Sequence, residues 1–367
     1  MRLTEPLAFK LVALFALIPL AGFLPLVLGP GQPMGQTPAP VWMNELVITA
    51  GSWPLDAGAP DLSAAFVAGL VERSTSIAYS YTPSTVSSVA AASMFTGLLP
   101  LMSGVQSAGQ RLPAGTWTTA MGLAAEGSAT AAFLEEPLIS ATGLEGFSTV
   151  EEDLEGAEVL ATRVLQLWNT EVDRPSFVWV HFADAGPGGS KVGDFLRRLE
   201  QAPGGLDEAR RAESLILMTA FASDGKLGLD NDSGFRVPLS LALPADLFGG
   251  LRSEGMASLV DVPQILIEVL GLPLPATRMD ARPSIVDAFK GSAVYNWTLL
   301  EGPDGHVLRR GIRRLTAPGR PPAALEGVQA WTAQEVGCDA GFERAPDGPA
   351  LYGKLLSQLL GPRPATD

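Results

Sequence analysis

Thr85 and Ser87 are the residues whose type and setting could supply a nucleophile. Both lie in TPSTVSSV, residues 82–89, at the start of a run of small residues with helical spacing that ends at Gly97. A hydroxyl is a poor nucleophile at neutral pH unless a neighbouring base or metal ion activates it. The alternative interpretation is that these hydroxyls cap a helix, a position that Ser and Thr favour. The free N–H groups there could still hold an anion.

Few side chains could activate such a hydroxyl. The chain has two histidines, His181 and His306, and one cysteine, Cys338. One cysteine excludes an intramolecular disulfide and any metal site built from several thiolates. His181 lies inside the apolar run SFVWVHFA, so we predict a hydrogen-bonded core histidine there rather than a base. His306 is predicted to be exposed.

Acidic residues follow two apolar runs. Asp184 directly follows SFVWVHFA, and Asp224 follows ESLILMTAF, residues 213–221. Hard divalent cations need several oxygen ligands, so two carboxylates do not make a tight site. We therefore predict that Asp184 caps a turn and that residues 223–225 form another turn. The acidic segment 224–232 lacks the length and the closing glutamate of an EF-hand loop, which predicts a solvated loop.

The elements that would position these residues alternate along the chain. Apolar strands are predicted at residues 45–50, 76–81, 128–134, 176–183, 213–221 and 237–244, and helices at residues 62–73, 84–97, 115–127, 157–169, 191–201 and 258–271. This alternation indicates an α/β fold with a mostly parallel central sheet and helices on both faces. In such sheets, sites form beyond the carboxyl ends of the strands. After Leu272 a proline-rich crossing, a hairpin around PDG and a closing helix, ALYGKLLSQLLG, indicate a small α+β subdomain.

Four segments occur in an order that resembles the sulfatase family of the alkaline-phosphatase superfamily. They are NELVITAGSW (44–53), TPSTVSSVAAASMFTGLLPLMSGV (82–105), RPSFVWVHFADAGP (174–187) and SLVDVPQILIEVLGLPLP (258–275). The resemblance covers residues 42–367 and implies a hydrolase fold whose active members hold Ca²⁺ or another divalent metal ion. It places the nucleophile at Ser87, or at Thr85 if two residues were inserted after it.

The resemblance also implies that the metal ligands are missing. The positions that match the family's ligands hold Gly51, Gly186, Phe221 and Ala222, and the family's histidine before Gly-Val is Ser103. Of that set only the carboxylate Asp184 remains. Without a cation, little would stabilise the equatorial oxygens of a sulfate or phosphate ester. We therefore expect no metal cofactor, with Ser87 and Thr85 as vestigial nucleophile candidates.

Two functions remain open on this basis. The first is a catalytically inactive sulfatase-like protein that binds or scaffolds a partner, either an unidentified protein or an anionic or glycan ligand near residue 85. The second is a divergent sulfatase- or phosphatase-type hydrolase or transferase that uses Ser87 or Thr85. The net charge of −14 and the pI near 4.7 make nucleic acid an unlikely partner. The one basic group, Arg309, Arg310, Arg313 and Arg314, is predicted to be a solvated strand edge.

The first 41 residues differ from the rest. LVALFALIPLAGFLPLVLG, residues 11–29, carries no charge and is long enough to cross a bilayer. Arg2 and Lys10 precede it, so the N-terminus is predicted to be cytoplasmic and the main domain extracytoplasmic. We expect an uncleaved anchor; a cleaved signal peptide would give a secreted protein. The predicted parts are the anchor or signal (1–29), a Pro/Gly linker (30–41), the sulfatase-like domain (42–290) and the α+β subdomain (291–367).

Overall fold

The computed structural model describes residues 44–56, 59–138, 144–224, 233–244, 249–270 and 272, together with four strands between residues 298 and 335. The chain divides into two compact units, Met1–Val41 and Trp42–Asp367, and all described residues belong to the second. No helix among them is both long and apolar enough to cross a membrane. The predicted anchor, linker and closing helix lie outside the described residues, and the domain boundaries remain predictions.

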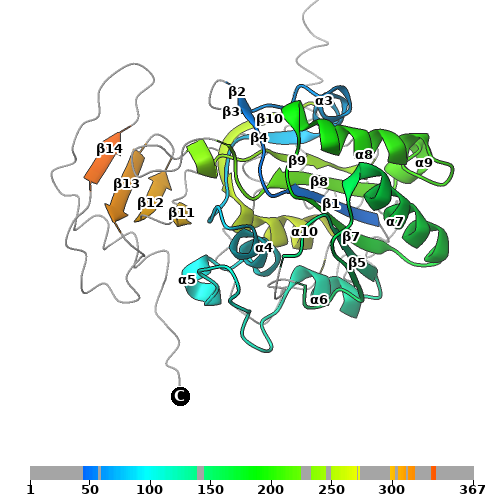
Figure 1. The fold of residues 1–367 in the computed structure, drawn as a ribbon, viewed down its shortest axis with the longest axis horizontal. Helices are drawn as coiled ribbons and strands as arrows, with labels where there is room; N and C mark the ends of the chain where they lie inside the picture. The colour runs from blue at the N-terminus through cyan, green and yellow to red at the C-terminus, as the bar shows by residue number, and fades with distance from the viewer. Residues whose placement is uncertain are drawn as a thin grey trace, which may run out of the picture. The chain divides into compact units, whose positions relative to one another are not determined.

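An eight-stranded sheet forms the centre of the described structure (Figure 1). The strand order is β10-β4-β9-β8-β1-β7-β5-β6. The strands are β1 (Asn44–Ala50), β4 (Thr75–Tyr81), β5 (Ala129–Leu134), β6 (Thr149–Glu151), β7 (Ser176–Phe182), β8 (Ser214–Ala220), β9 (Leu239–Ala242) and β10 (Arg252–Ser258). Only β9 runs antiparallel to its neighbours, β4 and β8, while the other pairings are parallel. The predicted mostly parallel sheet is therefore confirmed.

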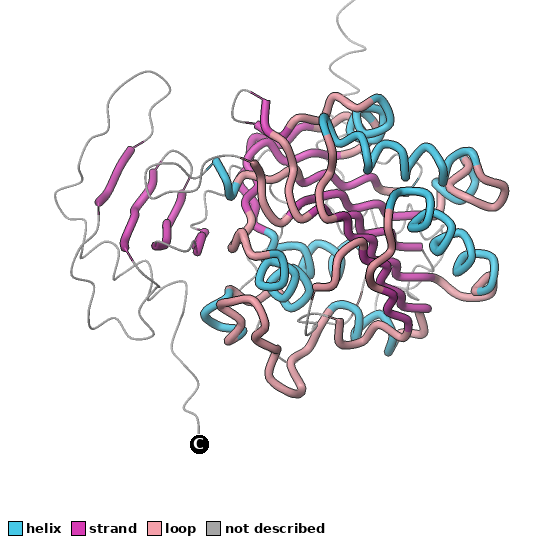
Figure 2. The backbone as a smooth tube through the Cα atoms, in the orientation of Figure 1, coloured by secondary structure: helices cyan, strands magenta, loops and turns pink. Residues whose placement is uncertain are grey.

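Helices cover both faces of this sheet, as Figure 2 shows. They are α3 (Ala65–Glu72), α7 (Gly156–Thr170), α8 (Ser190–Gln201) and α9 (Glu208–Arg211) on one side, and α4 (Ser87–Thr96), α5 (Pro100–Ser103), α6 (Thr119–Ala125) and α10 (Val262–Leu270) on the other. A ring contact joins a helix to strand β7 on each face of the sheet. Phe195 of α8 packs on Phe182, and Phe95 of α4 packs on Trp179. Trp179 and Phe182 lie on opposite faces because side chains alternate along a strand.

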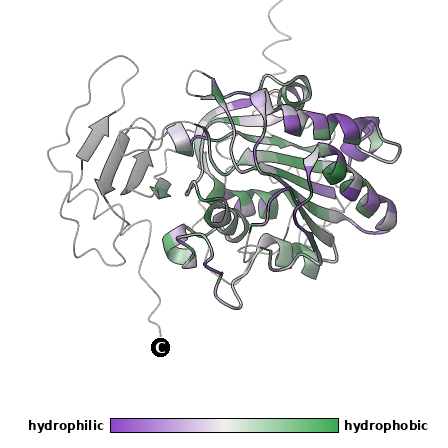
Figure 3. Ribbon diagram, in the orientation of Figure 1, coloured by the Kyte–Doolittle hydropathy of each residue, from purple (hydrophilic) through white to green (hydrophobic). Residues whose placement is uncertain are grey.

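Residue pattern explains which helix face is buried. In α8 the buried residues Val192, Phe195, Leu196 and Leu199 recur at the spacing of one helical stripe. The outward faces of α7, α8 and α9 are hydrophilic in Figure 3, whereas the strands beneath them are hydrophobic. Helix α4 is different, because every residue from Ser88 to Thr96 is buried. Its small side chains let it lie against both the sheet and α10.

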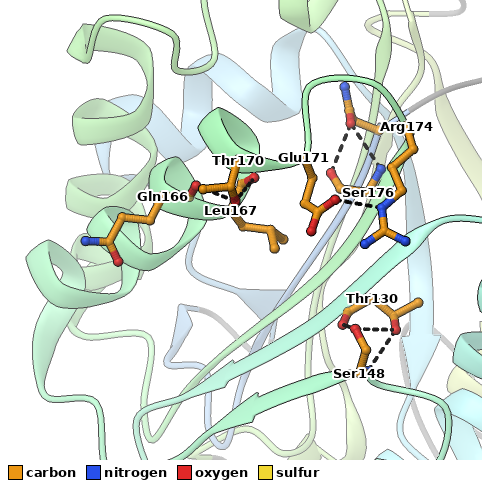
Figure 4. Close-up of polar contacts among 9 residues, drawn as sticks. Thr130, Ser148, Gln166, Leu167, Thr170, Glu171, Arg174 and Ser176 are labelled. Atoms are coloured by element: carbon orange, nitrogen blue, oxygen red, sulfur yellow. Dashed lines mark hydrogen bonds and ion pairs between the residues drawn. The ribbon is translucent and has the colours of Figure 1, made fainter.

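The amino-terminal ends of the strands are joined by side chains (Figure 4). Ser148 donates from its Oγ to the carbonyl of Thr130 at 2.7 Å and from its backbone N to Thr130 Oγ1 at 2.9 Å, which fastens β6 to β5. Ser176 donates from its Oγ to Asn44 Oδ1 at 2.9 Å, which ties β7 to β1. These contacts hold the amino-terminal ends of β1, β5, β6 and β7 together. A site is expected at the opposite edge, where the strands have their carboxyl ends.

Several elements differ from the sequence-based predictions, and three of them belong to the central sheet or the helix that follows β10. Strands β6 and β10 were not predicted, since β6 has three residues and β10, RSEGMAS, lacks an apolar alternation. The helix predicted from residue 258 begins later: Ser258 ends β10, Leu259–Asp261 form a 3-10 turn, and α10 starts at Val262. Ser258 N donates to Asp261 Oδ2 at 2.8 Å, which closes a capping box and delays the helix.

The C-terminal residues form a separate four-stranded antiparallel sheet in the order β11-β12-β13-β14. Its strands are β11 (Thr298–Glu301), β12 (Gly305–Arg310), β13 (Arg313–Pro318) and β14 (Thr332–Glu335). The hairpin predicted around PDG is confirmed, because β11 pairs with β12 across that turn. A third strand follows from the same stretch, and Arg309 and Arg310 pair in register with Arg314 and Arg313. A two-stranded ribbon, β2 (Leu55–Asp56) and β3 (Ala59–Pro60), lies nearer the start of the chain.

Candidate functional site

The candidate site lies where β1, β7 and β8 end, and its backbone segments are hydrogen-bonded to one another. The bonds beyond the strands run from Gly51 N to Phe182 O (2.7 Å), from Phe221 N to Ala50 O (2.8 Å), from Trp53 N to Ala222 O (2.9 Å) and from Ala185 N to Ser52 O (2.9 Å). The structure thus brings Gly51, Phe221 and Ala222 together at one edge, next to the segment that holds Asp184 and Gly186. Backbone hydrogen bonds between neighbouring strands therefore continue for a few residues beyond the strand ends at this edge.

Gly51 stands where an acidic side chain would be needed and has no room for one. A Cβ atom built on Gly51 would lie 2.4 Å from the carbonyl oxygen of Ala183 and 3.2 Å from Glu136 Oε1. The first distance is far below any real carbon–oxygen contact, and the obstacle is backbone. Gly51 is therefore required by the packing of this edge.

Gly186 is closed to a side chain for two reasons. Its φ is 71°, in the left-handed region that L-residues rarely adopt. A Cβ there would lie 2.6 Å from Ser190 Oγ. A histidine at this position would need a different backbone. The neighbouring Gly189, with φ 81°, packs so closely on Trp53 that its own Cβ would lie 2.6 Å from Trp53 Cζ2.

Aromatic rings fill the space behind the edge. Phe221 is fully buried and stacks on the His181 ring, with centroids 5.1 Å apart and planes 27° apart. Trp179 lies 5.9 Å from the same His181 ring. Trp53, also fully buried, donates from Nε1 to the carbonyl of Asp61 at 2.6 Å. A buried ring, that of Phe221, thus occupies one of the two positions that match the family's Asp-His pair, and the other position holds Ala222.

A chain of hydrogen bonds runs through these rings to the surface. Trp179 Nε1 donates to Thr49 Oγ1 at 2.8 Å, Thr49 Oγ1 lies 2.8 Å from His181 Nδ1, and His181 Nε2 lies 3.3 Å from Glu136 Oε1. Burial lowers the pKa of His181 below its ordinary 6.5, while the hydrogen bond to Glu136 and the charges of Glu136 and Glu135 oppose that shift. His181 is thus the buried, hydrogen-bonded core histidine that its apolar strand predicts. Thr49 is fully buried, so this threonine–histidine–glutamate chain offers no nucleophile to a substrate.

Asp184 lies in a small ionic group at the same edge. Its Oδ1 accepts the N–H of Gly186 at 2.9 Å, and its Oδ2 lies 2.6 Å from Lys191 Nζ. The hydrogen bond to Asp184 raises the pKa of Lys191 above its ordinary value. Glu135 Oε2 accepts the N–H of Ala183 at 2.8 Å and lies 3.8 Å from the same ammonium. Asp184 therefore holds a turn and a lysine, with its two oxygens already engaged.

Thr85 and Ser87 lie at the carboxyl end of β4, at the amino terminus of α4. Both are partly exposed. The structure corrects the capping alternative: Val86 occupies the N-cap position, and no side chain caps the helix. Ser84 Oγ instead accepts the N–H of Val86 at 3.3 Å. In the sheet order, β9 and β8 lie between β4, which precedes these hydroxyls, and β1, which precedes Gly51.

The remaining predicted residues have structural contacts. Asp224 Oδ1 accepts the N–H of Leu55 at 2.8 Å, and Ser223 Oγ donates to the carbonyl of Ser233. Ser103 ends α5, where its Oγ donates to the carbonyl of Pro100 at 3.1 Å and accepts the N–H of Val105 at 3.2 Å. Most of the acidic segment 224–232, and His306 as a side chain, lie outside the described residues.

The described residues at this edge do not fit a divalent metal ion. Across the described parts of the chain, no three His, Cys, Asp or Glu side chains are grouped so that they could hold a metal. More directly, positions 51 and 186 cannot carry a ligand on this backbone, and Phe221 fills a third position with a ring. Three carboxylates are present at this edge. Glu135 and Asp184 are oriented toward Lys191 and backbone N–H groups, and Glu136 is oriented toward His181 Nε2.

Sequence reasoning missed Trp53, Glu135, Glu136 and Lys191. Each gains its role from a long-range contact: Glu136 and His181 are 45 positions apart in the chain. One feature of the sequence could have indicated Glu135 and Glu136. They directly follow the apolar run of β5, and sites form at the carboxyl ends of such strands.

Comparison with known proteins identifies the fold. No protein-family model matches the sequence, and no curated protein matches it. Among solved structures, the phosphonate monoester hydrolase of Agrobacterium radiobacter matches with a TM-score of 0.66 and 16% identity, over 87% of this chain and 95% of that chain. The lipoteichoic acid synthase LtaP from Listeria monocytogenes matches with a TM-score of 0.63 and 11% identity, over 88% and 91%. A protein in the alkaline phosphatase superfamily from Vibrio parahaemolyticus matches with a TM-score of 0.61 and 11% identity, over 89% and 90%.

Proposed function

We propose that this chain, which has the sulfatase-like fold of the alkaline-phosphatase superfamily, is a pseudoenzyme that acts by binding rather than by ester hydrolysis. The observation that supports this most is the lack of room at position 51, where an added Cβ would lie 2.4 Å from the backbone oxygen of Ala183. At Gly186 the left-handed φ of 71° disfavours a side chain. Restoring the ligands on this structure would require a change of backbone as well as of side chains, which supports the proposed loss of catalysis.

The chemistry supports the same proposal. Transfer of a sulfuryl or phosphoryl group needs positive charge on the equatorial oxygens and an activated nucleophile. At the described edge the ammonium of Lys191 is hydrogen-bonded to Asp184, and the imidazole of His181 is buried and hydrogen-bonded to Thr49 and Glu136. A bare hydroxyl at Thr85 or Ser87 would have to react without either.

The second candidate is a divergent hydrolase or transferase that uses Ser87 or Thr85. One observation favours it: both hydroxyls are partly exposed at a helix amino terminus, where free N–H groups attract anions.

An assay on three ester classes separates these candidates. We would incubate the full-length chain with aryl sulfate, phosphate monoester and phosphonate monoester substrates, and compare it with the Ser87→Ala and Thr85→Ala variants. We expect no turnover above buffer for any of the three proteins. Turnover that disappears in one variant, while that variant keeps its melting temperature, would establish the hydrolase instead.

The proposed setting is a membrane anchor that holds the domain outside the cytoplasm. It rests on the uncharged run at residues 11–29 and on Arg2 and Lys10 before it. The test is membrane fractionation with protease treatment of intact cells. We expect the full chain to pellet with membranes and to be cleaved from outside, and Leu17→Arg, but not the linker change Gln32→Arg, to release it. A full chain that stays in the soluble cytoplasmic fraction would defeat the proposal.

The proposed ligand is a protein, or an anionic or glycan molecule at the amino terminus of α4. Ligands that bind the folded state raise the melting temperature with concentration. A sulfated glycan should therefore stabilise the chain more than its desulfated form at equal ionic strength. Equal melting temperatures with both forms would leave the protein partner as the only proposed ligand.

A further inference from the structure

The buried His181 is held in one tautomer by its two neighbours. Glu136, as a carboxylate, can only accept, so His181 Nε2 at 3.3 Å must carry the proton. In the neutral ring Nδ1 is then an acceptor, and Thr49 Oγ1 at 2.8 Å donates to it. Trp179 Nε1 can only donate, and it donates to the same Thr49 oxygen at 2.8 Å. The chain of hydrogen bonds therefore points from Trp179 to Glu136.

A second arrangement of hydrogens satisfies the same heavy atoms. If Nδ1 gains a proton, it can donate to Thr49 Oγ1, because a hydroxyl oxygen accepts two hydrogen bonds. The Thr49 hydroxyl hydrogen then turns to the carbonyl of Val180, which lies 3.4 Å away. Both ring N–H groups keep an acceptor, Thr49 on one side and Glu136 on the other. Only one buried hydrogen has to rotate.

The charges around the ring determine how readily that proton binds. Glu136 touches the ring, and Glu135, from the same loop after β5, acts on it through its charge. Asp184 and Lys191 lie beyond Glu135 and are paired with each other at 2.6 Å. The other described neighbours are uncharged: Phe221 and Trp179 in the sheet layer, and α4, whose sequence SSVAAASMFT holds no titratable group.

We propose that His181 is a buried proton-binding site that becomes charged reversibly as the pH falls, while the protein stays folded, and so turns its contact with the half-exposed Glu136 into an ion pair. The contact joins β7 to the loop after β5, directly above Gly51. Proton uptake in the core is thereby transmitted to a carboxylate at the edge of the sheet. This inference goes beyond the proposed function and does not depend on it.

The direction of the effect on stability follows from linkage. Burial, the largest cause, lowers the pKa of His181 in the folded protein. The unfolded chain then binds the proton more readily, so stability is full above pH 6.5 and is lost as the pH falls through the folded-state pKa. Glu136 limits this loss because its charge and hydrogen bond favour the protonated ring.

Histidine NMR tests the proposal directly. The chain has two histidines, so ¹⁵N-histidine labelling of the full-length protein gives two ring systems, and a His306→Asn variant assigns them. At pH 7.5 we expect His181 to show a protonated Nε2 and an unprotonated Nδ1. Below pH 6.5 we expect both nitrogens to become protonated while the amide spectrum stays folded. A neutral ring protonated at Nδ1, or a ring that stays neutral until the protein unfolds, overturns the proposal.

Variants distinguish a proton-binding His181 from a histidine that has only a structural role. Glu136→Gln keeps the size of the side chain but removes the charge, so the His181 midpoint should fall by about one pH unit. The matched exposed change Glu152→Gln should leave it in place. Thr49→Ser keeps the hydroxyl and should preserve both the tautomer and the midpoint. An unchanged midpoint in Glu136→Gln would show that the charge at Glu136 is not linked to the proton, contrary to the proposal.

Discussion

At the scale of single residues, Glu45 is the buried side chain that most clearly lowers the stability of the folded protein. Its side chain is buried near the start of β1, and its Oε2 has no hydrogen-bond partner among the residues that the structure describes. Burial raises the pKa of Glu45 well above its ordinary 4.5, although a hydrogen bond from its own backbone opposes the shift. The shift favours the neutral form of Glu45 in the folded protein. Its contribution to stability is full below about pH 4.5 and is lost as the pH rises through the folded-state pKa.

Glu45→Gln should therefore stabilise the protein in neutral and alkaline solution. Each unit by which the pKa is raised corresponds to about 1.4 kcal/mol. Urea denaturation of the variant and of the parent at pH 5 and pH 8 measures this difference, with the exposed change Glu126→Gln as the control. We expect the variant's advantage to grow between the two pH values. The same advantage at both would mean that Glu45 does not titrate differently in the folded state.

Phe221 supplies the apolar filling at the edge. Phe221→Ala removes a fully buried ring that stacks on His181, so it should cost about 3–5 kcal/mol of unfolding free energy. Phe221→Leu keeps most of the volume and should cost less than about 1.5 kcal/mol. Chemical denaturation of both variants measures the two costs. Equal and small costs would show that the edge is open rather than packed.

At the scale of elements, the tight packing of the turn after β1 is the feature that the proposed function depends on most. Gly51→Ala forces a Cβ to within 2.4 Å of the Ala183 carbonyl, so it should destabilise by about 1–3 kcal/mol or more. The matched change is Gly69→Ala in α3, where no atom lies within 4 Å of the new Cβ. That variant should be stabilised by about 0.5–1 kcal/mol through helix propensity. Thermal unfolding compares them, and a harmless Gly51→Ala would disprove the closed turn.

The same elements show what the sequence could predict. The apolar strands β1, β5, β7 and β8 follow from runs of buried residues, and their parallel order follows from the helices between them. Strand β10 could not be predicted, because its polar sequence is a strand only through its pairing with β4. The missing metal ligands at positions 51, 186, 221 and 222 stay a prediction that the family resemblance implies. The contacts of Trp53, Glu136 and Lys191 could not be predicted, because they depend on how distant segments meet.

At the scale of the whole molecule, the chain has a sulfatase-like fold, and glycines and buried rings are packed at the edge where the metal ligands are proposed to be missing. The fold matches solved structures, among them a protein in the alkaline phosphatase superfamily, over more than four-fifths of the chain. Packed rings and a hydrogen-bond chain ending at Glu136 now fasten the strands at that edge. The net charge of −14 will attract cations to the surface loosely, so bound ions must be counted in salt.

The most direct measurement is the metal content of the full-length protein. The chain is dialysed in about 0.15 M salt, which screens surface charge, against Ca²⁺, Mg²⁺, Mn²⁺ or Zn²⁺. It is then passed through a desalting column and analysed by elemental mass spectrometry. The account predicts far less than one ion per chain for every metal, with the same melting temperature before and after chelation. One tightly retained ion per chain, lost together with stability on chelation, would contradict it.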